Sequence, residues 1–103
     1  MSVKFTDLKS AELFKIFAEE IRLKIISRLI EREKHVNEIS KEIDIVQPLV
    51  SHHLRILKEK NIVKAARKGN KVIYSLNEKL RKNIRKDGKY ILDLGCCEIT
   101  IKE

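Results

Sequence analysis

The sequence has few of the residues that build cross-linked or membrane-bound proteins. It contains no tryptophan, three glycines and 5% aromatic residues. Its two cysteines, Cys96 and Cys97, are adjacent, so they cannot join distant elements, and a disulfide framework is excluded. No stretch approaches ~18 consecutive apolar residues, and the N-terminus lacks the apolar core of a signal peptide. These absences predict a cytoplasmic protein with no membrane partner.

The sequence also lacks the motifs of common catalytic sites. It has no glycine-rich phosphate-binding loop and no cluster of histidines and carboxylates spaced for a catalytic metal ion. Ser51 precedes His52 and His53, but consecutive helical residues point in different directions, so they do not form a nucleophile with its base. We therefore expect that the protein is not an enzyme.

Basic charge is the main feature of the composition. The 103 residues include 23 Lys and Arg against 15 Asp and Glu, a net charge of +8. Such an excess opposes self-association unless an anion is bound, and nucleic acid is the commonest anionic partner. A membrane-surface protein would also fit the charge, but no segment is a basic amphipathic helix with Trp or Phe on its apolar face. With 43% hydrophobic residues, the chain can form one domain, 1–103, with a modest aliphatic core.

Residues 47–58 form an amphipathic helix when placed at about 100° per residue. The face expected to be buried consists of Val50, Leu54 and Leu57. The opposite face consists of Gln47, Ser51, Arg55 and Lys58. Its amide, hydroxyl, guanidinium and ammonium groups are those that bind base edges and phosphates in a DNA major groove. His52 lies on the exposed side, whereas His53 lies at the edge of the buried face, where we expect it to be packed and hydrogen-bonded.

Three further helices are predicted before this one. They cover residues 8–18, 20–32 and 36–43, and the outer face of the second carries Arg22, Lys24, Arg28 and Arg32. A connection over 44–46 leads to the amphipathic helix, which extends to residue 60 and has Pro48 in its first turn, where a missing N–H costs nothing. Two helices joined by so short a connection predict a helix-turn-helix over 36–60, with the second as recognition helix.

A β-hairpin is predicted directly after the recognition helix. Asn61 suits the left-handed residue that ends a helix, and β-branched runs at 62–66 and 71–76 flank Arg67-Lys68-Gly69-Asn70. The tip carries Arg67, Lys68 and Lys71. Hairpin tips are often polar, but a basic hairpin that follows a helix-turn-helix is typical of a "wing" (62–76) that binds phosphates or a minor groove.

The C-terminal quarter, 77–103, is predicted to serve dimerisation and effector binding. Residues 77–87 form a short helix in this interpretation, capped by Asn77 and ended by Gly88. Leu80 and Ile84 are its only strong apolar positions, a stripe that suits packing on a partner. The alternation over 98–102 predicts a strand.

These motifs, in this order, resemble the ArsR/SmtB family of metalloregulatory winged-helix repressors over roughly residues 13–76. The resemblance is carried by Ala18-Glu19-Glu20-Ile21-Arg22, Gln47-Pro48-x-Val50-Ser51-His52-His53-Leu54-x-x-Leu57, Asn61-Ile62-Val63 and Tyr74-Ser75-Leu76. It implies a mainly α winged helix-turn-helix with a small β-hairpin. It also implies a homodimer through the first and last helices that binds a palindromic double-stranded DNA operator and is released by an inducer.

The resemblance makes Gln47, Ser51 and His52 the base or phosphate contacts, with Arg55 and Lys58 meeting phosphates. The complete predicted DNA-binding set is Gln47, Pro48, Leu49, Ser51, His52, Arg55, Lys58, Arg67, Lys68 and Lys71. The chain departs from the family twice. Leu49 stands where a small or hydroxylated residue is usual, and Val46 stands where a serine often caps the helix, which weakens the cap by about 1 kcal/mol.

The inducer site is the least determined part of the resemblance. His35 and Asn37 occupy the positions of the Cys-x-Cys of arsenic-sensing members, and 77–94 contains no histidine for a zinc site of the family type. Cys96 and Cys97 remain as metal ligands, and thiolates suit arsenite, antimonite, cadmium or copper(I). Arsenite binds about three sulfurs, so a further donor is needed. The cysteines could instead be packing residues or redox thiols.

Two functions from different classes remain open. The first is a repressor that a soft metal or metalloid at Cys96-Cys97 releases from DNA, or the same regulator without a metal. The second is a winged-helix subunit that docks on proteins in a larger complex. A docking face should expose apolar residues, so the basic wing and polar recognition face favour DNA.

Overall fold

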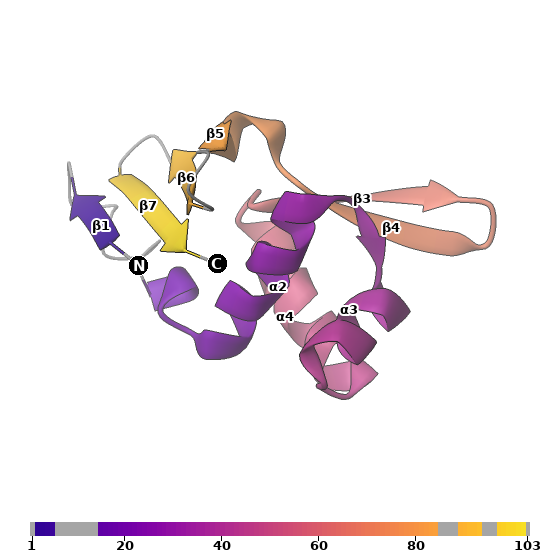
Figure 1. Cartoon of the computed structure of the whole chain (residues 1–103). Helices are drawn as coiled ribbons and strands as arrows, with labels where there is room; N and C mark the ends of the chain where they lie inside the picture. Colours follow the sequence, from indigo (N-terminus) through magenta and orange to yellow (C-terminus); the bar gives the residue numbers. More distant parts are fainter. Residues whose placement is uncertain (1, 6–14, 85–88, 94–96, 103) are drawn as a thin grey trace.

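The computed structural model describes residues 2–5, 15–84, 89–93 and 97–102. Within them, helices α2 (Glu20–Glu31), α3 (Val36–Ile43) and α4 (Gln47–Glu59) lead into strands β3 (Val63–Lys68) and β4 (Lys71–Leu76). Strand β2 (Lys34–His35) joins this hairpin in an antiparallel sheet of order β2-β4-β3. The arrangement is the predicted winged helix-turn-helix, in which α3 and α4 form the motif and β3–β4 the wing (Figure 1).

Local capping groups determine where α2 and α3 begin. The Glu19 side chain accepts a hydrogen bond from the backbone N–H of Ile21 at 3.2 Å, at the start of α2. His35 caps α3 and forms a capping box with Glu38. Asp44, with a left-handed φ of 56°, ends α3. The predicted bounds of these helices are therefore confirmed to within a residue. Of the predicted helix 8–18, residues 15–17 are helical and the part over 8–14 lies outside the described residues.

The core lies where the three helices meet the base of the wing. Aliphatic side chains dominate it, as the composition predicts: Ile16, Phe17, Ile25, Ile26, Leu29, Ile30, Ile39, Val50, Leu54, Leu57, Ile62, Val63 and Leu76. Each fully buried side chain of this size contributes about 1.5–3 kcal/mol of hydrophobic free energy. This packing holds α4 against α2 and α3 and leaves its other side open.

The predicted helix over 77–87 is wrong in its described part. The Asn77 side chain accepts from the Lys79 N–H at 3.2 Å, as a cap does, but only the 3-10 turn η1 (Glu78–Leu80) follows before strand β5 (Arg81–Ile84). Two apolar positions give a helix little surface to bury, whereas β5 gains backbone hydrogen bonds to β6 at the edge of a sheet. The homodimer was expected through the first and last helices, and 77–84 contains no such last helix.

The strand β5 belongs to a four-stranded antiparallel sheet of order β1-β7-β6-β5. Its other strands are β1 (Ser2–Phe5), β6 (Lys89–Asp93) and β7 (Cys97–Lys102). The predicted strand over 98–102 is confirmed and begins one residue earlier, while β1 was not predicted. Ser2 pairs with Thr100, so the two ends of the chain run side by side, on the side of α2 away from the wing (Figure 1).

Candidate nucleic-acid interface

The recognition helix α4 begins without a side-chain cap. Val46 occupies the N-cap with extended backbone angles, φ −61° and ψ 144°, and makes no side-chain hydrogen bond. The expected loss of this cap is confirmed. Pro48 lies in the first turn, and the helix ends at Glu59, followed by Asn61 with φ 60° in the predicted left-handed conformation.

The two faces of α4 separate as the helical periodicity predicts. The buried side chains are Val50, His53, Leu54 and Leu57. The exposed ones include all seven predicted contacts on this helix: Gln47, Pro48, Leu49, Ser51, His52, Arg55 and Lys58. No acidic residue occurs from 47 to 58, and within the described part of the chain neither Arg55 nor Lys58 forms an ion pair. The exposed face is therefore polar, basic and unneutralised.

A hollow runs between this face and the wing. It has a volume of about 400 Å³ and is lined by Pro48, Ser51, His52, Arg55, Lys58 and Tyr74. The Arg55 Nη2 lies 3.4 Å from the His52 Nδ1, which keeps both side chains over the hollow. Tyr74 comes from β4 and was missed as a site residue. The signal for it was alternation, because Tyr74 lies on the same side of β4 as the inward-facing Leu76.

The wing has a tighter turn than expected. Lys68 pairs directly with Lys71, so the loop is Gly69-Asn70 alone, and the predicted four-residue tip 67–70 is too long. Gly69 has a φ of +66°, which suits the first position of a type II′ hairpin turn. Arg67 pairs with Val72 and by alternation shares the face of Tyr74, whereas Lys68 and Lys71 share the other face.

The three basic wing residues are exposed but not equivalent. Lys68 Nζ lies 2.8 Å from the Glu33 Oε1, so its charge is already paired within the chain. Arg67 contacts the carbonyl of Gly69 at 3.4 Å, through its Nε. Among the described residues neither Arg67 nor Lys71 has an acidic partner. The wing therefore presents two free cations, one on each face of the hairpin.

His53 joins the recognition helix to α2. Its side chain is 7% exposed, and its Nδ1 accepts a hydrogen bond of 3.1 Å from the Arg22 Nε. Burial lowers the pKa of His53, and the neighbouring Arg22 lowers it further, so the ring is held neutral as an acceptor. The expectation of a packed, hydrogen-bonded His53 is confirmed. Arg22, expected on the outer face, is instead half-buried in this contact.

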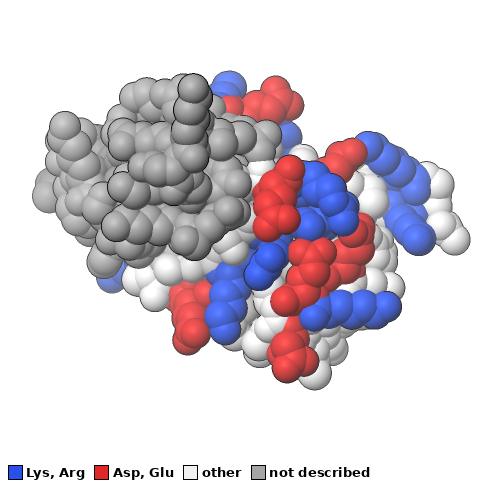
Figure 2. Space-filling model, viewed as in Figure 1, with Lys and Arg blue, Asp and Glu red and all other residues white. Residues whose placement is uncertain are grey.

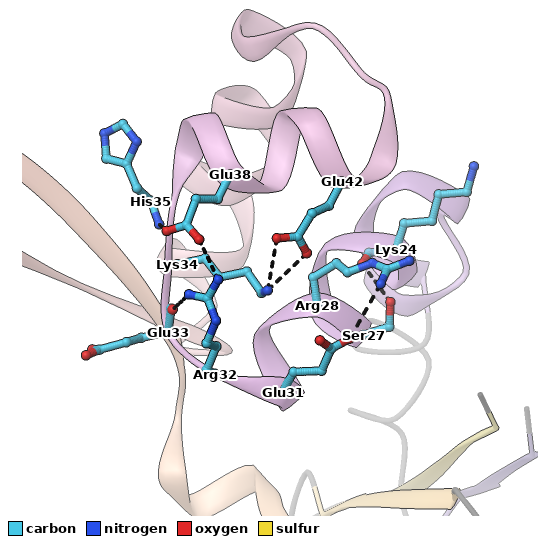
Figure 3. Close-up of polar contacts among 10 residues, drawn as sticks. All are labelled: Lys24, Ser27, Arg28, Glu31, Arg32, Glu33, Lys34, His35, Glu38 and Glu42. Carbon is cyan, nitrogen blue, oxygen red and sulfur yellow. Dashed lines mark hydrogen bonds and ion pairs between the residues drawn. The ribbon is translucent and has the colours of Figure 1, made fainter.

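Charges on the face formed by α2 and α3 are paired. Blue and red side chains alternate there in Figure 2, and Figure 3 shows the contacts from which the pattern arises. The Arg32 Nη2 lies 2.6 Å from the Glu38 Oε2, and this pair raises the pKa of Arg32 and lowers that of Glu38. Lys34 Nζ lies 3.0 Å from each carboxylate oxygen of Glu42. This face is close to neutral, unlike the exposed face of α4.

Known proteins share this winged helix-turn-helix. A family model described as "Bacterial regulatory protein, arsR family" matches residues 19–65. An HTH-type transcriptional regulator of Methanocaldococcus jannaschii is 40% identical over 79 residues, which cover 76% of this chain and 89% of the relative. This chain belongs to the arsR family. The predicted winged-helix fold is thereby confirmed, and the family to which the chain belongs is one of regulatory proteins.

Other relatives of this arsR-family chain are named repressors. The HTH-type transcriptional repressor SmtB of Mycobacterium tuberculosis is 37% identical over 67 residues, 65% of this chain and 50% of the relative, so the match spans half of that protein. The crystal structure of the transcriptional repressor BigR from Xylella fastidiosa superposes with a TM-score of 0.64 at 34% identity, over 68% of this chain and 71% of BigR.

The positions predicted to bind a metal ion in this arsR-family chain are only partly described. His35, which replaces the first cysteine of the Cys-x-Cys position, accepts the Asn37 N–H at 3.1 Å through its Nδ1 and so caps α3. Among the described residues, no group of three or more His, Cys, Asp or Glu could hold a metal ion. Cys96 lies outside the described residues, and Cys97 begins β7 opposite Phe5. The cysteine pair stays a prediction.

The helices in the described part of this arsR-family chain are also too short or too polar to cross a membrane.

Proposed function

We propose that this protein is a transcriptional repressor that binds double-stranded DNA in a sequence-specific manner. The observation that carries the proposal is the exposed face of α4, which runs from Gln47 to Lys58 without an acidic residue and lies beside a basic wing. It is supported by relatives that are named transcriptional repressors. Because the charges of the α2–α3 face are paired, α4 and the wing attract phosphates more strongly than that face does.

In this proposal α4 lies in the major groove with its N-terminal turns against the base edges. Gln47 and Ser51 can donate to and accept from base edges, and Gln is suited to adenine. Arg55 and Lys58 line the hollow beside Tyr74, which suits a backbone phosphate because two cations face it. Arg67 and Lys71 would bind phosphates from the wing, while Lys68 must first leave Glu33.

We propose that the protein acts as a homodimer in the cytoplasm. Two copies would place their α4 helices in successive major grooves, about 34–36 Å apart, and so bind a palindromic operator. The four-stranded sheet at the chain ends has two open edges, β1 and β5, which could join the copies. Analytical ultracentrifugation tests this state, and a monomer that binds a single half-site with full affinity would contradict it.

We further propose that Cys96 and Cys97 bind a soft metal or metalloid ion as inducer. Two adjacent thiolates are suitable donors for arsenite, antimonite, cadmium or copper(I), and arsenite would take a further donor from elsewhere. The C96S/C97S variant should bind the operator normally and lose its release by arsenite. Release that persists in this variant would mean that the cysteines are structural or redox groups.

The DNA proposal is tested by fluorescence anisotropy with the gene's own upstream region and an unrelated duplex, at two salt concentrations. Arg55→Ala should weaken operator binding about tenfold or more, because a charged contact is worth roughly 1–3 kcal/mol. Lys24→Ala is the matched control, since it removes one cation that is paired with Glu20 on α2. Binding that is indifferent to both salt and sequence would favour a protein-docking subunit instead.

A further inference from the structure

Three large apolar side chains stand exposed in the described part of the chain. Val46 is 69% exposed, Leu49 38% and Val72 37%. Single exposed apolar residues are common on protein surfaces. Here, however, two of the three lie at the N-terminal end of α4, within an otherwise polar and basic face. The question is what these two side chains bind.

Val46 occupies a position where a polar residue would stabilise the helix. Its extended backbone angles are those of an N-cap, at which Ser, Thr, Asp or Asn would accept a hydrogen bond from the first turn. Side-chain caps begin the two preceding helices, through Glu19 at α2 and His35 at α3. A valine at this position leaves the helix without a side-chain cap and an isopropyl group exposed to water. We explain both costs by a contact that is made only in a complex.

Leu49 extends the same apolar patch. It lies three residues after Val46 and therefore on nearly the same side of the helix. Gln47 and Pro48 between them are also exposed, so the patch adjoins the amide that is suited to a base edge. The N-terminal residues of a recognition helix are those that reach base edges. Both apolar side chains are thus placed where base pairs are distinguished.

The major groove offers one prominent apolar group, the 5-methyl of thymine, and apolar side chains contact it. We propose that Val46 and Leu49 bind thymine 5-methyl groups and so select T·A pairs in each half-site. This inference rests on the proposed DNA binding. It adds the base that is recognised by Val46 and Leu49, the two positions at which the chain departs from the family pattern. The loss of a polar group at both positions then replaces a hydrogen-bonding preference by a methyl-binding one.

The test removes the methyl group and nothing else. A duplex bound by the full chain is selected from a random double-stranded pool, and each thymine of a half-site is replaced in turn by deoxyuridine. At the contacted positions, affinity measured by anisotropy should fall about fourfold, which corresponds to ~0.8 kcal/mol for a group of one carbon. Exchange of thymines elsewhere in the site should leave the affinity unchanged.

Protein variants then assign each methyl to a side chain. Leu49→Ala and Val46→Ser should each lose the response to deoxyuridine at one position and keep it at the other. Val46→Ser also supplies the missing cap, so its melting temperature should rise while its response to deoxyuridine at that one position disappears, which separates recognition from folding. Val72→Ala is the control, an apolar residue on the wing that is as exposed as Leu49 and should keep both responses.

The outcomes distinguish a failure of this inference from a failure of the DNA-binding proposal on which it rests. If the selected duplex is bound specifically but no thymine-to-deoxyuridine exchange weakens binding, the inference is wrong and the repressor proposal stands. The same holds if the V46S/L49A double variant keeps the full deoxyuridine response. If no duplex is selected from the pool at all, the DNA-binding proposal itself fails, and the inference with it.

Discussion

Removal of the Glu42 carboxylate, which lies on α3 and pairs with the strand β2 that precedes this helix, should destabilise the fold strongly. Its two oxygens each lie 3.0 Å from Nζ of Lys34, the residue that begins β2 (Figure 3). The Lys34 side chain is 3% exposed and that of Glu42 is 31% exposed. Glu42→Ala therefore leaves an ammonium group buried without its counter-charge.

The magnitude follows from this uneven burial. Loss of one partner from a fully buried ion pair costs about 3–5 kcal/mol. Because water still reaches Glu42, we expect a loss at or below the lower end of this range, about 2–3 kcal/mol. For a domain of this size, each kcal/mol lowers the melting temperature by about 4–8 °C, so the melting temperature should fall by about 10–20 °C. Circular dichroism melts at one fixed protein concentration measure this, since association would shift the midpoint.

Two further variants decide whether burial is the cause. Glu33→Ala breaks the Lys68–Glu33 pair, which is shorter at 2.8 Å but has side chains 58% and 51% exposed, and should cost less than about 1 kcal/mol. K34M/E42A removes both charges and keeps most of the buried volume, so it should recover most of the stability lost in Glu42→Ala. The reasoning is refuted if Glu42→Ala and Glu33→Ala melt alike, or if the double variant is no more stable than Glu42→Ala.

Three other results are expected. Because burial and then Arg22 lower the pKa of His53, its contribution to stability is complete above the ordinary pKa of 6.5 and is lost as the pH falls below it. The melting temperature should thus drop between pH ~7.5 and ~5.5, and His53→Gln should flatten that drop. Gly69→Ala should lower stability by about 1 kcal/mol in urea titrations, through its positive φ alone, since the space around a new Cβ is open; no loss would contradict the turn geometry. Arg67→Ala should reduce the salt dependence of DNA binding by about one unit of slope, and Lys68→Ala by less, because Lys68 is paired with Glu33; equal slopes would argue against that pairing in solution.

The helix-turn-helix could be predicted because local and long-range preferences agree there. Apolar residues recur at helical spacing in α2 and α4, and the same residues form the core. The predicted connection over 44–46 begins at the left-handed Asp44, so the end of α3 and the start of α4 could be predicted from the sequence. The hairpin was likewise indicated by β-branched runs around Gly69, although its pairing register, which shortens the turn to two residues, depends on cross-strand contacts.

The strand β5 could not be predicted because the local signals of residues 77–87 point to a helix. Asn77 does act as a cap, yet the chain continues as a strand after one 3-10 turn. The deciding interactions are non-local, since β7 pairs with β1 from the opposite end of the chain and β5 pairs with β6. The same limit applies to two contacts of α4. The Arg22 that binds His53 is 31 residues earlier, and Tyr74 reaches the hollow from the wing.

Departures from local preference gather at the recognition helix rather than scattering over the fold. Within the described residues, α4 is the helix that begins without a side-chain cap, it buries a histidine that must stay neutral, and it exposes Leu49. The missing cap lowers stability and the buried histidine makes stability depend on pH, while the neighbouring helices α2 and α3 follow the ordinary rules of capping and paired charge. Proteins retain such departures where another property requires them. We therefore infer that α4 is the helix most directly involved in binding. That concentration is a reason, independent of charge, to seek the DNA contacts at Val46–Lys58.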